Sequence, residues 1–291
     1  MLFCERRISM KKILKIFTVF VLLFGIYFAN EFVISKPLEA QTAYTDDKVE
    51  LPIIMYHSIL RDTARAGDYV VSPDALASDL DYLKSNGYET VTISDLIRYV
   101  DGLADLPKKP VMITFDDGHF NNYLYAYPLL KERNMTAVIS VIGSETEKFT
   151  NTGEENAYWS YLNINRLKEM SDVFEIQNHS YDMHSQSPRK GSTRIRGESK
   201  EDYQNILVSD TEKLQKLLTD NGISAPTCYT YPYGIYSSES EEIIESLGFL
   251  CTLTCEERVN TLTRNPECLF KLGRFNRPSG ISTEEFFKKI S

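Results

Sequence analysis

Continuous apolar runs that alternate with helical patterns place the strongest constraint on how this chain can fold. Many of the candidate strands are apolar throughout, without the apolar and polar alternation of a sheet that has one face in water. The eight candidate strands lie at residues 51–55, 88–92, 111–115, 136–142, 173–176, 228–231, 249–253 and 269–272. Strands of this kind are typical of a parallel sheet covered by helices, so the alternation predicts one α/β barrel.

The segments between the runs carry helix signals. Ser72-Pro73 opens a segment that Gly87 closes, Ser94 opens another, and residues 202–218 have apolar side chains at helical spacing. No internal repeat and no second domain interrupts this pattern. Residues 49–291 are therefore predicted to form a single domain.

Charge excludes one class of partner. The whole chain has a formal net charge of −9, and residues 1–40 contribute six basic and three acidic side chains, so the remainder stands at −12. A body this acidic repels phosphate backbones, which argues against nucleic-acid binding. The 42% hydrophobic content is sufficient for a packed core and excludes a disordered chain.

The amino-terminal region has the pattern of a targeting segment. Residues 16–29 carry no charge and follow a basic flank made of Arg6, Arg7, Lys11, Lys12 and Lys15. We expect residues 1–36 to be a membrane anchor or a cleaved signal peptide, with Met10 as an alternative start and a buried core helix as the remaining interpretation. Residues 37–48 are predicted to be a polar linker. The basic flank would stay inside, which places the body on the outer face of a membrane or in the medium.

Four cysteines lie near the carboxyl end, at positions 228, 251, 255 and 268. Outside the cell an even number permits disulfides, and buried free thiols are the alternative. Cys251 and Cys255 would be about 13 Å apart on a continuous strand, which is too far for a bridge. We therefore predict a Cys255–Cys268 disulfide.

Residues 185–200 form a stretch rich in serine, glycine and arginine. Five basic side chains there face one acidic side chain, Glu198. A solvated loop is the simpler interpretation, and contact with a substrate or a cell surface is the alternative.

Titratable side chains follow the apolar runs. His57 ends the first run, Asp116 and Asp117 end the third, and His179 ends another. The carboxyl ends of parallel strands in a barrel meet at one rim, so these groups are expected to converge although they are far apart in sequence.

One carboxylate and two imidazoles form a ligand set that leaves positions open on a divalent metal. A second aspartate is then available for acid–base chemistry. Asp116, Asp117 and Gly118 are also compatible with a plain turn, because Asp-Gly pairs are common in turns. His179 and His184 are five residues apart, so one helical face would not present both, and an HExxH zinc site is excluded.

The motifs resemble those of the NodB-homology polysaccharide deacetylases, carbohydrate esterase family 4. Thr114-Phe-Asp-Asp-Gly118 matches the first family motif, and His179-Ser180 with His184 resembles the second, with one extra residue between the histidines. Tyr231-Pro-Tyr-Gly234 resembles the third, with Thr230 in place of the usual arginine. No histidine follows His184, so the late catalytic histidine of the family is missing. These departures resemble the extracellular poly-N-acetylglucosamine deacetylase branch.

The resemblance implies a distorted (β/α) barrel with fewer than eight regular units, and metal-dependent removal of acetyl groups from an N-acetylated polysaccharide. It implies that Asp117, His179 and His184 hold Zn²⁺, or Co²⁺ or Ni²⁺, and that Asp116 is the general base. In this branch the early histidine takes the place of the late one, which makes His57 the proton donor to the leaving amine. A backbone N–H near Tyr233 would stabilise the oxyanion, and Arg274 would orient Asp116.

Two interpretations compete with a poly-N-acetylglucosamine deacetylase. The same chemistry would serve peptidoglycan or chitin oligomers, and a glycan-binding biofilm matrix protein would keep the pocket without turnover. Retention of both aspartates argues against the binding protein, and Thr230 argues mildly for it. Trp159 and Tyr181 are candidates for stacking on sugar faces, while His119 is expected on the groove rim without a catalytic task.

Overall fold

A parallel sheet forms the centre of the body. The computed structural model describes residues 48–290, so the expected membrane segment at 1–36 and nearly all of the linker lie outside the described residues. The strand order is β10-β9-β8-β7-β6-β2-β12, with β5 beside β6, and the neighbouring strands of this sheet are parallel to one another. The strands are β2 (Ile53–Tyr56), β5 (Glu89–Thr90), β6 (Pro110–Phe115), β7 (Ala137–Val141), β8 (Phe174–Asn178), β9 (Cys228–Thr230), β10 (Cys251–Leu253) and β12 (Phe275–Asn276).

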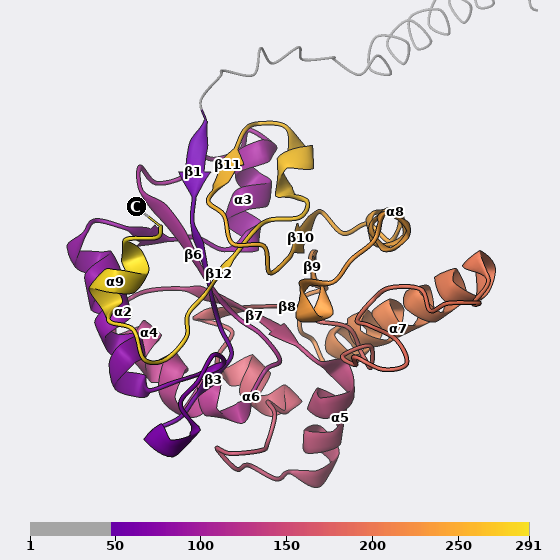
Figure 1. Ribbon diagram of the computed structural model, residues 1–291, viewed down its shortest axis with the longest axis horizontal. Helices are drawn as coiled ribbons and strands as arrows, with labels where there is room; N and C mark the ends of the chain where they lie inside the picture. The colour runs from indigo at the N-terminus through magenta and orange to yellow at the C-terminus, as the bar shows by residue number, and fades with distance from the viewer. Residues whose placement is uncertain (1–47, 291) are drawn as a thin grey trace, which may run out of the picture. The chain divides into compact units, whose positions relative to one another are not determined.

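Burial on both faces explains the continuous apolar runs. All residues of β2, β6 and β7 are buried. Helices surround the strands, as Figure 1 shows, and supply the covering that a parallel sheet requires. The helices are α2 (Pro73–Ser85), α3 (Ile93–Val100), α4 (Tyr127–Glu132), α5 (Gly143–Thr152), α6 (Ile164–Glu169), α7 (Lys200–Asp220), α8 (Ser238–Ser246) and α9 (Thr283–Phe287).

The sheet curls, and a late segment of the chain connects its two edges. Leu272 forms an isolated parallel bridge with Leu253 at the end of β10, and β12 then pairs with β2. This arrangement agrees with the predicted distorted barrel. The strand expected at 269–272 is wrong: residues Pro266–Leu269 form a short 3-10 helix, η4, because Asn265 caps the backbone N–H of Glu267 and Pro266 starts the turn.

Helix starts follow from capping side chains. The Ser72 hydroxyl accepts a hydrogen bond from the backbone of Ala75, so α2 begins where Ser72-Pro73 predicted. The next helix begins earlier than predicted from Ser94. Thr92 is its cap, in a reciprocal capping box with Asp95, and this pair satisfies two backbone N–H groups that Ser94 alone would not.

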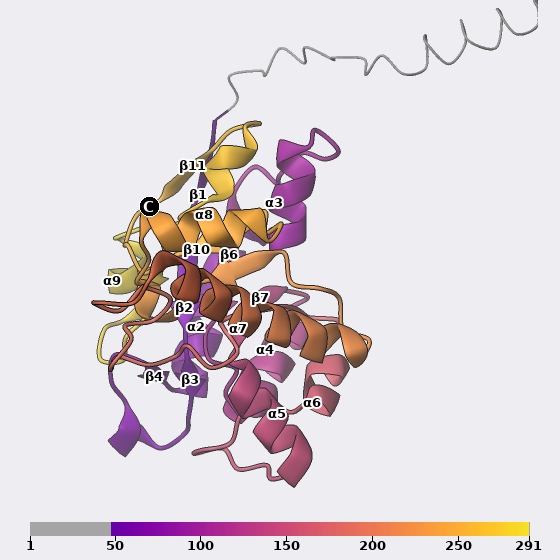
Figure 2. The same cartoon turned by 90° about the vertical axis from the view of Figure 1, so that its right-hand side faces the viewer.

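Two small sheets and one helix pair complete the body. The antiparallel pair joins β1 (Val49–Leu51) to β11 (Asn260–Leu262), and the parallel pair joins β3 (Ser58–Ile59) to β4 (Val70–Val71). Figure 2 shows α7 and α8 running side by side on one flank. Among residues 48–290, no helix has the length and apolar character needed to span a membrane.

The cysteine prediction is wrong. All four cysteines in the described part of the chain are free. The Cys268 thiol contacts the backbone of Thr263, whereas the Cys255 thiol lies 3.8 Å from the Met55 sulfur in another part of the body. Cys228 and Cys251 are fully buried partners on neighbouring strands and pack as small apolar residues.

Candidate active site

Strand ends bring the predicted groups to one rim. His57 follows β2, Asp116 and Asp117 follow β6, and His179 follows β8. Because these strands are parallel neighbours in the sheet, their carboxyl ends lie together. With the loops around them they line one cavity of about 850 Å³. The expectation that these distant residues converge is therefore confirmed.

Three side chains form a candidate metal site. The ligand atoms of Asp117, His179 and His184 all lie within 4.8 Å of one another. The Nε2 atoms of His179 and His184 lie 3.5 and 3.2 Å from the same oxygen, Asp117 Oδ1. This oxygen is buried and has no hydrogen-bond partner among residues 48–290. A buried carboxylate oxygen without a donor, facing two imidazole nitrogens, fits a divalent cation.

The His179 ring is fixed in the state that a ligand needs. Its Nδ1 lies 2.7 Å from the backbone oxygen of Thr230, which can only accept, so Nδ1 carries the proton. The Nε2 lone pair is then free to face Asp117. Burial alone would lower the pKa of His179, but the nearby Asp117 and Asp116 carboxylates outweigh it and raise the pKa.

The candidate general base is held by a buried arginine. Arg274 donates to both carboxylate oxygens of Asp116, at 2.6 and 2.8 Å, and both side chains are almost fully buried. Burial raises the pKa of Asp116, but the Arg274 charge and its hydrogen bonds outweigh burial, so the pKa falls below its ordinary value. Asp116 is thus a carboxylate at neutral pH, and Arg274 lies where the resemblance implied.

His57 lies on the cavity wall, with its ring against Tyr69 at 4.8 Å between centroids. Its Nδ1 is buried and has no hydrogen-bond partner within the described part of the chain. Burial lowers the pKa of His57, and the charges of Asp116 and Asp117 act in the opposite direction. The ring is therefore positioned by packing against Tyr69, without a hydrogen bond from Nδ1 to another described residue.

Three non-glycine residues of the rim have left-handed backbones: Asp117 (φ 69°), Ser180 (φ 69°) and Tyr233 (φ 59°). Such conformations cost on the order of 1–3 kcal/mol each and gather at functional sites. Gly118 lies beside Asp117 with φ 77°, and a Cβ on it would come within 2.9 Å of Val141. The turn that presents Asp117 therefore requires glycine at this position.

Tyr233 packs on the metal site. Its ring lies 4.4 Å from the His184 ring, and its hydroxyl donates to the His184 backbone oxygen at 3.4 Å. It lies in η3 (Pro232–Gly234), directly after β9, and lines the cavity. Thr230, at the position of the usual arginine, offers its backbone oxygen to His179, as any residue there would, and its hydroxyl lies 2.6 Å from the Ser140 hydroxyl.

Apart from His119, which was expected on the groove rim, the other cavity residues were not expected from the sequence. Tyr69 and Tyr158 are exposed aromatic residues on the wall, and the Arg65 guanidinium lies 5.1 Å from the Tyr158 ring centroid. His119 Nε2 lies 3.4 Å from Asp117 Oδ2. Only His119 had a sequence signal, since it directly follows Asp-Asp-Gly, whereas the others come from loops without a pattern.

The expected stacking residues lie away from the cavity wall. Tyr181 is buried, its hydroxyl donates to Glu147, and Lys213 lies 3.8 Å from its ring centroid. Trp159 is 57% exposed, but its indole N–H donates to Glu154 and it is not among the residues that line the cavity. Its neighbour Tyr158 takes the position that was expected of Trp159.

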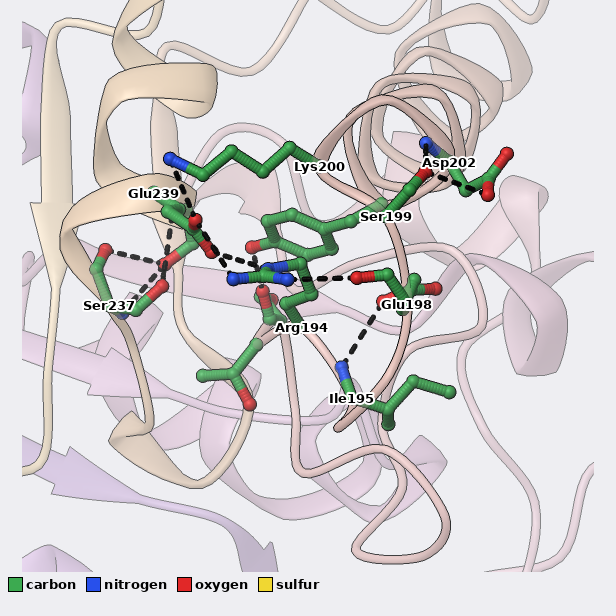
Figure 3. Close-up of polar contacts among 12 residues, drawn as sticks. Arg194, Ile195, Glu198, Ser199, Lys200, Asp202, Ser237 and Glu239 are labelled. Carbon is green, nitrogen blue, oxygen red and sulfur yellow. Dashed lines mark hydrogen bonds and ion pairs between the residues drawn. The ribbon is translucent and has the colours of Figure 1, made fainter.

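The basic loop after His184 pairs part of its charge within itself and with α8. Arg189 and the backbone N–H of Ile195 both donate to the Glu198 carboxylate. Figure 3 shows Arg194 between the Glu198 backbone oxygen and Glu239 of α8. Ion pairs of Arg189 and Arg194 therefore hold the loop in place, while Lys190 and Arg196 have no ion-pair partner within residues 48–290.

Comparison with known proteins agrees with this geometry. A family model described as polysaccharide deacetylase matches residues 104–251, just over half of the chain. Poly-beta-1,6-N-acetyl-D-glucosamine N-deacetylase of Staphylococcus aureus (strain MRSA252) is 27% identical over 201 residues, which cover 68% of this chain and 65% of the relative.

Two solved structures extend the likeness. A de-N-acetylase from Aggregatibacter actinomycetemcomitans has 25% identity and a TM-score of 0.67, covering 82% of this chain and all of that one. IcaB from Ammonifex degensii has 27% identity and a TM-score of 0.66, covering 79% and 92%. The match of motifs, fold and family model shows that this chain belongs to the polysaccharide deacetylase family, hydrolases that act on carbon–nitrogen bonds of carbohydrates.

Proposed function

We propose that this chain is a metal-dependent deacetylase that removes acetyl groups from N-acetylhexosamine units of an extracellular polysaccharide, poly-N-acetylglucosamine foremost. The observation that carries the proposal is the Asp116–Arg274 pair beside the three metal-site groups. A protein that only bound glycan would not need a buried carboxylate held in its ionised form beside a metal site.

Asp117, His179 and His184 would hold the metal, with Zn²⁺ the first candidate and Co²⁺ or Ni²⁺ the alternatives. One carboxylate and two imidazoles suit these ions. Since the carboxylates raise the pKa of His179, the metal competes with a proton for its Nε2. Metal affinity should therefore fall as the pH is lowered.

Different residues around the site accept and donate the protons of the reaction. When bound, the metal supplies a Lewis acid that polarises the acetyl carbonyl and lowers the pKa of water. Asp116 takes the proton from the attacking water, because Arg274 keeps its carboxylate ionised. His57 gives a proton to the departing amine, and a backbone N–H near Tyr233 donates to the acetyl oxygen.

The open side of the cavity suits a sugar chain. Tyr69 and Tyr158 are 59% and 46% exposed and offer ring faces on which pyranose rings can lie. Arg65, stacked over Tyr158, has no ion-pair partner among residues 48–290 and can donate to sugar oxygens. The named activity of the Staphylococcus aureus relative supports a β-1,6-linked polymer, and this chain spans 65% of that relative.

The proposed place of action is the outer face of the membrane or the medium. It rests on the basic flank and uncharged run within residues 1–36, which precede the described body. An exported polymer as substrate is consistent with that placement.

Acetate release from defined glycans tests the proposal. The full chain would be assayed on β-1,6-linked N-acetylglucosamine oligomers, chitin oligomers and peptidoglycan, before and after chelation and after zinc or cobalt is added back. We expect acetate from the β-1,6-linked oligomers, loss on chelation and recovery with metal. Full activity in protein shown to be metal-free would refute the metal assignment, and glycan binding without acetate from any polymer would favour the matrix protein.

A pair of variants separates the base from the ligands. Asp116→Asn should keep the metal and lose turnover, because it removes the base and leaves the three ligands in place. His184→Ala should lose both metal and activity. Metal content by elemental analysis and acetate release are measured on both proteins. Near wild-type turnover in Asp116→Asn would reduce Asp116 to a structural residue.

A further inference from the structure

The Asp117 carboxylate has a different neighbour on each oxygen. Its Oδ1 lies near His179 and His184, as described, whereas its Oδ2 lies 3.4 Å from His119 Nε2. Asp117 has no arginine partner within residues 48–290, in contrast to Asp116. Of the four histidines, His119 has no part in the proposed mechanism.

Packing fixes where the His119 ring points. His119 and Tyr161 form an isolated antiparallel bridge, and their rings lie 4.8 Å apart. Backbone hydrogen bonds on both sides of the bridge, Phe120 to Ser160 and Leu162 to Gly118, hold the two segments together. The ring is 23% exposed and lines the cavity.

We propose that His119 is a positioning residue for the Asp117 carboxylate. Its Nε2–H donates a hydrogen bond to Asp117 Oδ2, which leaves Oδ1 as the single oxygen that binds the metal. The inference rests on the proposed function, since it assigns His119 a task toward the proposed metal site. Without the hydrogen bond from His119, the Asp117 carboxylate, which stands on a left-handed backbone, can rotate and present either oxygen to the metal. Outer partners of metal ligands typically contribute 10–100-fold in metal affinity.

The test is zinc affinity, measured on the full chain by competition with a chromophoric chelator. His119→Ala should weaken zinc binding by about 10–100-fold. His119→Gln should recover most of the loss, because a glutamine amide N–H can reach the position of Nε2. Tyr161→Phe is the matched control, since it keeps the packing ring beside His119, and should bind zinc as the wild type does.

Two results would overturn the positioning role. Wild-type zinc affinity in His119→Ala would show that Asp117 needs no donor, and equal weakening in the alanine and glutamine variants would show that only packing matters. Failure of the proposed function is distinguishable, because then the wild type itself would bind no zinc and His184→Ala would change nothing. The Co²⁺ absorption spectrum adds a second readout, since a carboxylate that binds through both oxygens changes the coordination number.

Discussion

At the scale of single residues, an arginine from outside the usual motif supports the base. Thr230 occupies the position where the family pattern has arginine, and Arg274 donates to both oxygens of Asp116 from another part of the chain. A buried carboxylate without such a partner would be protonated more easily. The Asp116–Arg274 charge pair therefore forms in this chain without an arginine at position 230.

His57 gives a prediction for proton donation. His57→Ala should keep zinc and lose about 10²–10⁴-fold in rate on the glycan amide, the usual contribution of a positioned acid. It should lose much less on an activated ester, whose leaving group needs no proton. Because burial lowers the pKa of His57, the wild-type rate should fall as pH rises through a value below 6.5, and this limb should be absent in the variant.

Rates on both substrates across pH, together with metal content, check this role. Equal losses on the ester and the amide would contradict it, as would an unchanged alkaline limb in His57→Ala. In either case the ring would serve the site by packing against Tyr69.

The sequence predicted the site residues that follow strands and missed those in loops. His57, Asp117 and His179 end apolar runs, and the geometry of a parallel sheet makes such ends converge. Tyr69 and Arg65 reach the cavity from loops around β3 and β4, where no periodicity indicates direction. Arg274 was identified by resemblance alone, because a single charged residue has no pattern.

At the scale of elements, the lack of a periodic pattern also explains why the sequence did not predict β12. β12 has two residues between Arg274 and Arg277, so no apolar run marks it. β12 is a strand because its backbone pairs with β2, and side-chain periodicity carries no information about that pairing. Longer elements such as α7 were predicted to within two residues, since helical spacing repeats along them.

The loop from His184 to α7 gives an element-scale prediction. Glu198 receives two bonds from Arg189 and one from the Ile195 backbone, and its side chain is 8% exposed. Glu198→Gln should loosen residues 185–199 and speed tryptic cleavage after the basic residues there. Glu201→Gln, an exposed change in the first turn of α7, is the matched control.

The same contact has a predicted pH dependence. Hydrogen bonding to Arg189 lowers the pKa of Glu198, so the stabilisation is complete above the ordinary glutamate value of about 4.3 and is lost as pH falls through the lower folded value. Cleavage rates are measured from pH 8 downward with a protease active over that range. Equal rates for Glu198→Gln and wild type at neutral pH would show that the ion pair does not hold the loop.

At the scale of the whole molecule, a buried charge pair joins distant parts of the chain. Asp79 of α2 accepts hydrogen bonds from Tyr56, from Arg277 at 2.7 and 3.1 Å, and from Thr283 of α9. Asp79 and Arg277 are fully or almost fully buried. The early helix and the carboxyl-terminal segment are thus fixed to each other through one carboxylate.

Asp79→Asn should destabilise the protein strongly. It leaves the Arg277 charge buried without its partner, which costs about 3–5 kcal/mol in comparable cases. Asp81→Asn is the matched control on the same helix: it removes an exposed pair with Arg133, and exposed pairs contribute little. Thermal and denaturant unfolding measure both, and similar midpoints for the two variants would contradict a joining role for Asp79.

The position of β12 beside β2 has a consequence for the order in which activity arises during synthesis. The three candidate metal ligands are all present once His184 has been made, but Arg274 lies later in the sequence and is made after them. A shorter chain contains every proposed ligand and lacks the cation that keeps Asp116 ionised. In the proposed mechanism the base therefore gains its cation only after the candidate ligands are complete, and a chain that ends before Arg274 is expected to lack turnover.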